Sequence, residues 1–374
     1  MSLLAQPTTI NGLRLRNRIV MLPMVTNLSA KDGQATQALL NHYAERARRD
    51  ISLVIVETTA IGAETRNTVN SLGIWGDFQI PSLARLVDSI KAGGAAAAIQ
   101  LTHAGAKTYC DEQPPVSASP VRLRAGMAPR QLREDELPAI VDQFAQAARR
   151  AQAAGFDAVE IHAAHFYLLS AFLSPFSNRR DDGYGGDRER RARLAVEVTR
   201  AVRQTVGAAY PVLVRMHGGE RLAGGMTEED VLETARLLAG AGADAVDVSV
   251  TNQSAALEDE HGTYYSMKPY LTKEQPAGAL AYQAVAIRHA SGLPVIAVGK
   301  LGDPAAAEAL LAAGDVDLIG VARGFLVDPS LATKMLAGRG DDIVRCKQCL
   351  TCLNTVVGKQ LPIRCAVNKQ VGQR

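Results

Sequence analysis

The chain has 374 residues, of which 47% are hydrophobic and 21% are charged, and its formal net charge is +3. This composition excludes a disordered chain and supplies enough apolar side chains for a large core. No basic block indicates a nucleic-acid partner, and no apolar run reaches the ~18 residues that a membrane span needs. Because the N-terminus lacks the pattern of a signal peptide, we expect a cytoplasmic protein without a membrane partner.

The predicted elements alternate between strands and helices along the chain. Eight short apolar runs predict strands buried on both faces, as in parallel sheets. They are Ile19–Leu22, Leu53–Glu57, Ala96–Leu101, Ala158–His162, Val212–Met216, Ala245–Ser249, Val295–Val298 and Asp317–Val321. Eight such strands favour an α/β fold of the closed (β/α)8 TIM-barrel type over a doubly wound sheet, whose Gly-x-Gly-x-x-Gly turn we do not find. We assign residues 1–340 to the barrel and residues 341–374 to a Cys-rich segment.

A weak internal repeat marks three of the expected helix-to-strand turns. Its copies are Ala154–Glu160, Ala241–Asp247 and, more loosely, Ala313–Ile319. The glycine in each copy suits the left-handed residue that ends a helix. Thr227 and Asp230 predict a capping box at the start of the helix before the second copy.

Two longer segments, residues 103–133 and 250–276, follow predicted strands. Loops after barrel strands lie on the catalytic face, so we expect both segments to form lids or substrate walls. The second segment carries several polar and aromatic side chains, namely Asn252, His261, Tyr264, Tyr265 and Tyr270.

Polar and glycine residues gather where the predicted strands end, which is where barrels carry their functional groups. Gln100 suits the polar edge of a heterocycle, and Arg215 suits a negative charge on such a ring. Gly299 and the turn Gly320–Arg323 follow the last two strands, where barrels commonly bind phosphate through backbone N–H groups.

The end of the fourth strand, Glu160–Tyr167, carries the densest chemistry. His162 and His165 can bind a metal, although no third ligand is evident. They can instead donate hydrogen bonds to a carbonyl oxygen that becomes an enolate, with Tyr167 as a nearby proton donor. A third interpretation is that these side chains only cap the loop.

The chain resembles the old yellow enzymes over about residues 5–335. The resemblance rests on the Glu-Ile-His-x-x-His-x-Tyr-Leu-Leu motif from Glu160 and on the Phe-Leu-Ser-Pro-x-x-Asn-x-Arg-x-Asp-x-Tyr-Gly-Gly motif from Phe172. Further matches are Leu15–Met21, Pro23-Met24, Leu72–Trp75, Ile99–Gly105 and Asp328-Pro329.

This resemblance implies a barrel that binds FMN and reduces the alkene of an α,β-unsaturated carbonyl compound, with NAD(P)H as electron donor. It implies hydride transfer from flavin N5 to the β-carbon and protonation of the α-carbon by Tyr167, while His162 and His165 hold the carbonyl oxygen. The flavin contacts that it implies are Pro23, Met24, Ala60, Gln100 and Arg215, with Gly299, Ala322 and Arg323 on the phosphate.

Two positions depart from the family pattern. Phe166 stands where Gly is usual, so we expect a narrower pocket or a displaced Tyr167. Val25 stands where many members carry a Thr or Cys that touches the flavin, and valine cannot hydrogen-bond a flavin carbonyl. We therefore expect an altered redox potential, unless Thr26 substitutes, and an altered substrate.

Four of the five cysteines, Cys346, Cys349, Cys352 and Cys365, lie in the last thirty residues, whereas Cys110 stands alone. Clustered cysteines in a cytoplasmic chain indicate a metal centre rather than disulfides. Three closely spaced cysteines and a distant fourth favour a [4Fe–4S] cluster over zinc or free thiols. The tail also resembles the iron–sulfur branch that contains trimethylamine dehydrogenase and 2,4-dienoyl-CoA reductase.

That branch continues into a nucleotide-binding portion whose Rossmann fingerprint is not found in this sequence. We therefore consider a self-contained barrel, a piece of a longer protein, or a subunit that needs a redox partner protein. No Cys lies between residues 20 and 35 for a cysteinyl-FMN link, and Trp75 is the only Trp, so no aromatic cage for an amine is evident. We favour ene reduction over amine oxidation. An electron-transfer subunit, a flavin-free or metal-dependent barrel and a homo-oligomer stay open.

Overall fold

The computed structural model describes residues 2–109, 114–268, 271 and 273–373. Cys110 and Tyr270, which the sequence analysis singled out, lie outside the described residues.

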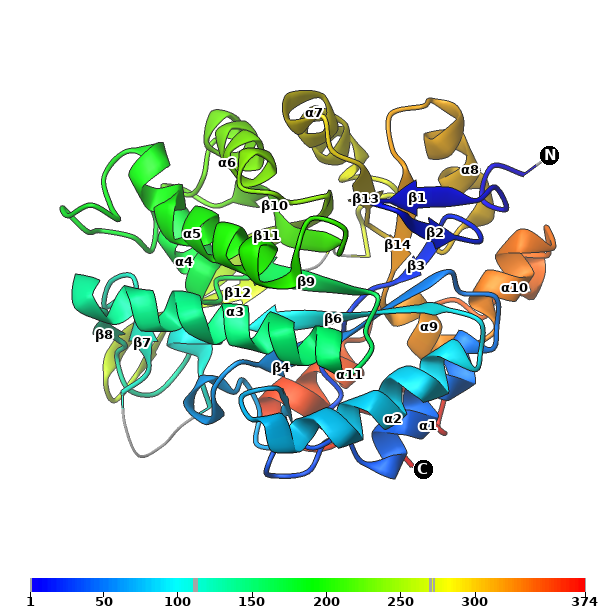
Figure 1. Ribbon diagram of the computed structural model, residues 1–374, viewed down its shortest axis with the longest axis horizontal. Coiled ribbons are helices and arrows are strands. Elements are labelled where there is room, and N and C mark those ends of the chain that lie inside the picture. The colour runs from blue at the N-terminus through cyan, green and yellow to red at the C-terminus, as the bar shows by residue number, and fades with distance from the viewer. Residues whose placement is uncertain (1, 110–113, 269–270, 272, 374) are drawn as a thin grey trace.

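Eight parallel strands close into a barrel (Figure 1). They are β3 (Ile19–Met21), β4 (Leu53–Ala60), β6 (Ala96–Thr102), β9 (Ala158–Ala163), β10 (Val212–Arg221), β11 (Ala245–Asp259), β13 (Val295–Ala297) and β14 (Leu318–Val321). Each strand pairs with the next one in this order, and β14 pairs with β3 to complete the circle. The predicted TIM barrel is confirmed, and every strand overlaps its predicted run.

Helices follow the strands and surround the barrel. They are α1 (Gln37–Ala47), α2 (Ile80–Lys91), α3 (Leu137–Ala153), α4 (Leu168–Leu173), α5 (Arg188–Val206), α6 (Glu228–Gly240), α7 (Ala281–Ser291), α8 (Pro304–Ala312), α9 (Arg323–Val327) and α10 (Leu331–Leu336). The predicted capping box starts α6, where the backbone N–H groups of Thr227 and Asp230 each donate to the other residue's side chain. The repeat glycines Gly155, Gly242 and Gly314 all have positive φ, as helix termination requires.

Two layers of apolar side chains hold the barrel together. Outward-facing strand residues pack against the helices, and inward-facing ones fill the barrel. The hairpin of β1 (Thr8–Ile10) and β2 (Leu13–Leu15) adds Ile10 and Leu15 to the inner layer. Successive strand residues point to opposite faces, so burial on both faces produces the continuous apolar runs seen in the sequence.

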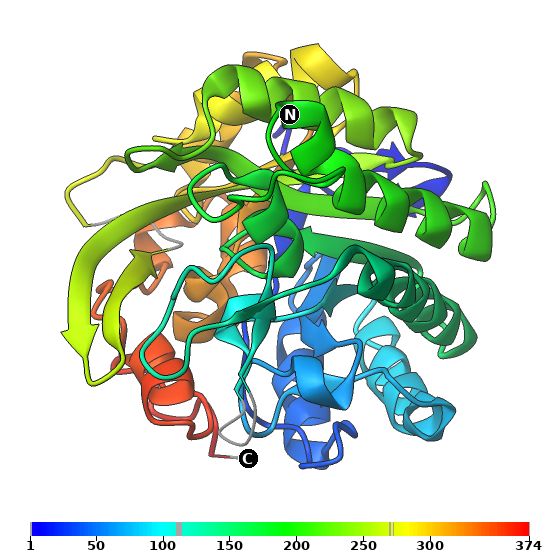
Figure 2. The same ribbon diagram turned by 90° about the vertical axis from the view of Figure 1, so that its left-hand side faces the viewer.

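The segment 250–276 differs from the loop that we expected. β11 continues to Asp259 and returns as the antiparallel strand β12 (Gly262–Lys268), which forms a long hairpin beyond the barrel (Figure 2). Among the described residues of the segment 103–133, most are irregular, and the short strands β7 (Val116–Ser117) and β8 (Arg130–Gln131) pair with one another. The hairpin extends a barrel strand whose first residues are buried, while its later residues are largely exposed.

The C-terminal segment packs onto the loops at one end of the barrel. It contains the short helix α11 (Thr351–Leu353) and a π-helical turn at Asn354–Gly358. The backbone N–H of Ile363 donates to the carbonyl of Thr26 at 2.8 Å, and the Asn27 side chain donates to the carbonyl of Gln360 at 2.9 Å. The loop after β3 is therefore held by the tail. Within the described part of the chain, no helix combines the length and the hydropathy of a membrane span.

Glu57 is a buried carboxyl beneath this same loop. It lies at a register shift in β4, where it accepts hydrogen bonds from the Thr26 backbone at 3.1 Å and from the Tyr43 hydroxyl at 3.3 Å. Burial raises the pKa of Glu57 from 4.5 to about 7. The folded protein therefore keeps a proton between these two pH values that the unfolded chain releases, and stability falls as the pH rises through this window.

We predict that Glu57→Gln stabilises the protein at pH 8 relative to the wild type and does so much less at pH 5. The shift in pKa corresponds to roughly 3 kcal/mol of lost stability above the window, which a neutral amide avoids. Urea unfolding of both proteins at the two pH values measures the difference. An equal effect at pH 5 and pH 8 would contradict the assignment of a raised pKa to Glu57.

Candidate active site

Four neighbouring strands place polar side chains in one buried layer. Gln100 on β6 is in register with Glu160 on β9, and its Nε2 donates to the Glu160 carboxyl at 2.7 Å. Arg215 on β10 is in register with Asp247 on β11, and the Arg215 Nε lies 3.2 Å from the Asp247 carboxyl. The sequence analysis identified Gln100 and Arg215 as site residues.

Glu160 and Asp247 were missed as members of this layer. Both are acidic residues inside otherwise apolar strands, at the matching last position of the first two copies of the repeat. A charged side chain in a strand that is buried on both faces is the signal that could have identified them. Burial raises the pKa of Glu160, and the nearby Asp247 raises it further, while Arg215 opposes both effects. Burial also raises the pKa of Asp247.

The two histidines of the sequence motif face one another. The Nε2 of His162 lies 3.2 Å from the Nδ1 of His165, and the other side of the His165 ring places Nε2 2.6 Å from the Ser249 hydroxyl. The backbone N–H of Ala164 donates to His162 Nδ1 at 3.3 Å. Burial lowers the pKa of both histidines well below the usual value, and Arg215 lowers both further. Both rings are therefore neutral near pH 7.

Tyr167 joins the histidine pair. Its ring centroid lies 4.7 Å from that of His162, and its hydroxyl accepts a hydrogen bond from the Asn67 side chain at 2.8 Å. Burial raises the pKa of Tyr167, and the bond from Asn67 opposes this. Lys107 lies over the Tyr167 ring, 5.9 Å from its centroid, and burial lowers the pKa of Lys107 to about 8. Asn67 belongs to the loop after β4 and no motif marks it, so the sequence analysis did not find it.

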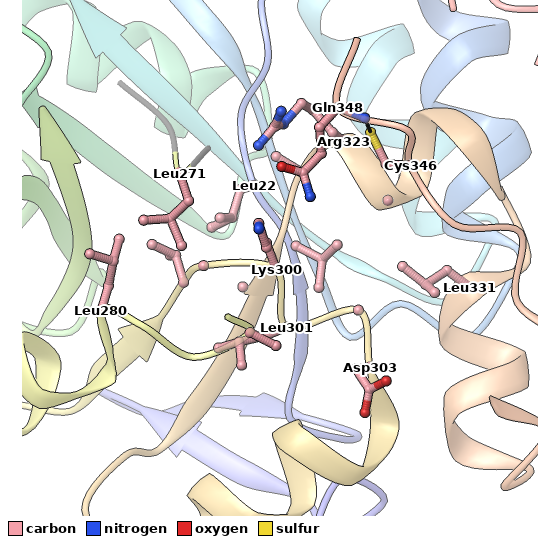
Figure 3. A pocket seen from close by; sticks show the side chains of 18 of the residues that line it. Leu22, Leu271, Leu280, Lys300, Leu301, Asp303, Arg323, Leu331, Cys346 and Gln348 are labelled. Carbon is pink, nitrogen blue, oxygen red and sulfur yellow. Dashed lines mark hydrogen bonds between the residues drawn. The ribbon is translucent and has the colours of Figure 1, made fainter. Parts of the chain in front are cut away.

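A cavity of about 330 Å³ adjoins the buried polar layer that contains Arg215 (Figure 3). Four of the predicted flavin contacts line it together, namely Arg215, Gly299, Ala322 and Arg323. Gly299 has φ of +116°, a backbone conformation that favours glycine. The other expected flavin contacts lie at neighbouring strand ends outside the lining of this cavity. They are Pro23, Met24 and Val25 directly after β3, Ala60 at the end of β4, and Gln100 on β6.

The four C-terminal cysteines line a second, smaller cavity. Cys346, Cys349, Cys352 and Cys365 are all free thiols. Among the described residues, no three His, Cys, Asp or Glu side chains are grouped as a single metal ion would require. Backbone N–H groups nevertheless point at two sulfurs at 3.4 Å, from Gln348 to Cys346 and from Val367 to Cys365. Arg323 and Cys346 line both cavities, so the two spaces adjoin.

Phe166 does not line the larger cavity, and the expectation that it narrows the substrate pocket or displaces Tyr167 stays a prediction. His165 and Phe166 are both left-handed, with φ of 61° and 55°, and this turn directs the Phe166 side chain elsewhere. Phe166 is fully buried in a small cluster with Ala106, Val121 and Leu123. Tyr265 and Met267 of β12 pack against the same cluster. Phe166 thus supports the base of the β11–β12 hairpin.

Thr26 was considered as a substitute for the hydroxyl that Val25 lacks. Its hydroxyl accepts the backbone N–H of Leu28 at 3.3 Å, and its own N–H donates to Glu57. The Thr26 side chain is fully buried, and its backbone carbonyl accepts from Ile363 of the tail.

The structure thus combines a closed (β/α)8 barrel, a buried layer that contains Gln100 and Arg215, and a cavity at the ends of its last strands. Residues 3–342 match the family described as "NADH:flavin oxidoreductase / NADH oxidase family", and the chain belongs to it. The resemblance to old yellow enzymes is thereby confirmed.

Known proteins similar to this chain include a "Metal reductase" from Desulforamulus reducens, with 37% identity over 377 residues that cover 100% of this chain and 54% of the relative. The solved structure of a 2-naphthoyl-CoA reductase aligns with a TM-score of 0.91 at 25% identity, over 99% of this chain and 57% of that one. The old yellow enzyme homologue from Zymomonas mobilis aligns with a TM-score of 0.76 at 27% identity, over 90% and 92% of the two chains. The chain thus spans about half the length of the first two.

We predict that Phe166→Gly destabilises the protein by about 2–4 kcal/mol. Removal of a buried phenyl ring costs about 3–5 kcal/mol, and relief of the left-handed backbone returns only about 1 kcal/mol. Urea unfolding measures the change, and Phe166→Leu, which keeps most of the apolar volume, should lose much less. A glycine variant as stable as the wild type would show that the Phe166 cluster contributes little.

Proposed function

We propose that this chain reduces the C=C bond of an α,β-unsaturated carbonyl compound, with FMN as the resident cofactor and NAD(P)H or a redox partner protein as the electron source. The observation that carries the proposal is the meeting of two neutral imidazoles and a phenol, His162, His165 and Tyr167, within one buried cluster. Such a cluster donates hydrogen bonds to one oxygen and a proton to a neighbouring carbon.

The barrel offers groups that fit FMN, which supplies hydride when it is bound. The Gln100 Nε2 donates to Glu160. The side-chain carbonyl oxygen of Gln100 is buried and has no hydrogen-bond partner among the described residues. That oxygen suits the N–H of the flavin pyrimidine edge, because a buried acceptor needs a donor. Arg215 suits the negative charge of the reduced ring. Gly299, Ala322 and Arg323 suit the phosphate, and Pro23, Met24, Val25 and Ala60 suit the ring faces.

The histidine pair would polarise the substrate carbonyl. Neutral imidazoles donate hydrogen bonds without giving up a proton, so they stabilise the charge that develops on oxygen as the β-carbon accepts hydride. Because burial keeps both rings neutral, this role persists across the physiological pH range. The closed environment also strengthens each hydrogen bond relative to water.

Tyr167 would supply the proton to the α-carbon. Asn67 donates to the phenol oxygen, which leaves the phenol O–H directed to another acceptor. After the proton leaves, the same Asn67 bond stabilises the phenolate. Asn67 is therefore a positioning residue for the acid.

We further propose that residues 1–340 form the FMN barrel and that residues 341–374 hold a [4Fe–4S] cluster through Cys346, Cys349, Cys352 and Cys365. Zinc binds sulfur at about 2.3 Å, which brings four sulfurs within roughly 4 Å of one another. The four thiols instead surround a cavity without forming a single-ion group, which favours a larger cluster. The shared wall of Arg323 and Cys346 would place such a cluster beside the flavin.

Tyr167→Phe should slow the oxidation of the reduced enzyme by an enone by about 10²–10⁴-fold and change flavin reduction by NAD(P)H less than about twofold. Anaerobic stopped-flow measurement of the two half-reactions separates these effects. Tyr282→Phe is the matched control, because Tyr282 lies on α7 and is 61% exposed. Equal losses in both half-reactions would argue against Tyr167 as the acid.

The same preparation distinguishes the alternatives. About one FMN per chain eliminates a flavin-free or metal-dependent barrel. Reduction of the flavin by an amine, without reoxidation by enones, would assign the chain to amine oxidation instead. Failure of the isolated chain to turn over an enone with NAD(P)H, with FMN bound, would favour an electron-transfer subunit.

Cys349→Ser should abolish bound iron and the broad iron–sulfur absorbance while it leaves the FMN content unchanged. Elemental analysis for iron and zinc, together with the visible spectrum, measures both groups. Ser291→Ala serves as a control, because Ser291 ends α7 and lies outside residues 341–374. One zinc per chain and no iron in anaerobically prepared protein would overturn the cluster assignment.

A further inference from the structure

Ser249 takes no part in the chemistry described so far, yet it ends a chain of hydrogen bonds that starts at His162. Ala164 N–H donates to His162 Nδ1, so the His162 proton must lie on Nε2. His162 Nε2 lies 3.2 Å from His165 Nδ1, which therefore accepts a hydrogen bond from the His162 N–H. The single ring proton of neutral His165 then lies on Nε2, 2.6 Å from the Ser249 hydroxyl oxygen, which accepts a hydrogen bond from it.

This arrangement cannot by itself hold a substrate oxygen with both rings. In the ligand-free chain of bonds, the His162 N–H is directed to His165, and the His165 N–H is directed to Ser249. For both rings to donate to one oxygen placed between them, His165 must carry its proton on Nδ1. His165 Nε2 then becomes an acceptor and needs a donor, because a buried acceptor left without one weakens binding.

Ser249 can serve as the hydrogen-bond partner of His165 Nε2 in both tautomers of the ring. A hydroxyl is both a donor and an acceptor, so the same 2.6 Å contact can run from His165 to Ser249 or from Ser249 to His165. Carboxylates and backbone carbonyls can only accept, and they would fix His165 in the wrong tautomer. Ser249 is 3% exposed and lies on β11 in register with His217 of β10, which makes its position rigid.

The surroundings of His165 favour a proton shift over a rotation of the ring. The His165 backbone N–H donates to His217 Nε2 at 2.6 Å, and Lys107 donates to the His165 carbonyl at 2.8 Å. His217 is itself bonded through Nδ1 to Glu220 at 3.0 Å. The backbone that carries the ring is thus held from both sides, and a ring flip would break both side-chain contacts.

We propose that Ser249 is the positioning residue that lets His165 change tautomer when a carbonyl oxygen or oxyanion binds between the two histidines. In the change, water takes the proton from His165 Nε2 and water gives one to Nδ1, so His165 stays neutral and the number of protons is unchanged. The Ser249 hydroxyl turns from acceptor to donor. This inference rests on the proposed function only in that the histidine pair binds an oxygen.

The test uses the FMN-loaded protein with ¹⁵N-labelled histidine. The ¹⁵N shifts of an imidazole report which nitrogen carries the proton, and the chain's seven histidines permit assignment through single variants. The probe is cyclohexanone, whose carbonyl oxygen only accepts hydrogen bonds and which has no C=C bond to be reduced. In the wild type we expect His165 to carry its proton on Nε2 without the probe and on Nδ1 with it.

Ser249→Thr keeps the hydroxyl and should behave as the wild type in both measurements. Ser249→Ala should retain the Nε2 proton when the probe is added and bind the probe about tenfold more weakly. Ser52→Ala is the matched control, because Ser52 is a buried serine just before β4, at the opposite end of the barrel strands from Ser249. FMN affinity is measured for each variant, since Ser249 also lines the flavin cavity.

A His165 proton that stays on Nε2 in the probe-bound wild type would overturn the proposal. So would a Ser249→Ala variant that changes tautomer and binds the probe as the wild type does. A tautomer change without any enone reduction would support the role of Ser249 and count against the proposed reaction, so the two ideas fail separately.

Discussion

The pairing of β9 with β6 and of β10 with β11 determines where the polar groups of this barrel lie. The register joins Gln100 to Glu160 and Arg215 to Asp247 inside a space that is otherwise filled by apolar side chains. A buried arginine is stable there only because a carboxyl lies beside it. Asp247 thus holds Arg215 in place at the cavity, and Glu160 orients the amide of Gln100.

The histidine cluster depends on that layer in turn. Arg215 and burial keep His162 and His165 neutral, so each ring retains one N–H and one acceptor nitrogen. The rings then act as hydrogen-bond donors whose direction is set by their partners, Ala164 and Ser249. The strand end at His162 and the left-handed turn at His165 and Phe166 place these rings and Tyr167 together, while Phe166 fixes the turn from the other side.

Much of this architecture can be predicted from the sequence, because strands that are buried on both faces appear as continuous apolar runs. Continuous apolar runs predicted the eight strands, and the glycines of the repeat predicted three helix ends. The side-chain contacts between distant strands and loops could not be predicted, because no motif or spacing in the sequence marks them. Asn67 reaches Tyr167 from 100 residues away, and Ser249 reaches His165 from 84 residues away. Neither Asn nor Ser is unusual in a loop or at a strand end, so only the three-dimensional pairing distinguishes them. The sequence predicts a loop where the β11–β12 hairpin lies, because the hairpin residues are exposed or half-buried and carry no apolar run.

The central claim is that hydride goes to the β-carbon of an enone and that a solvent-exchangeable proton goes to its α-carbon. Anaerobic reaction of the reduced, FMN-loaded protein with 2-cyclohexenone in D₂O, followed by NMR of the product, tests this directly. We predict reoxidation of the flavin and a saturated ketone with deuterium at the α-carbon, and deuterium at the β-carbon as well wherever the N5 hydrogen has exchanged with D₂O. A flavin that stays reduced in the presence of the enone, or a product with deuterium only at the β-carbon, would contradict it.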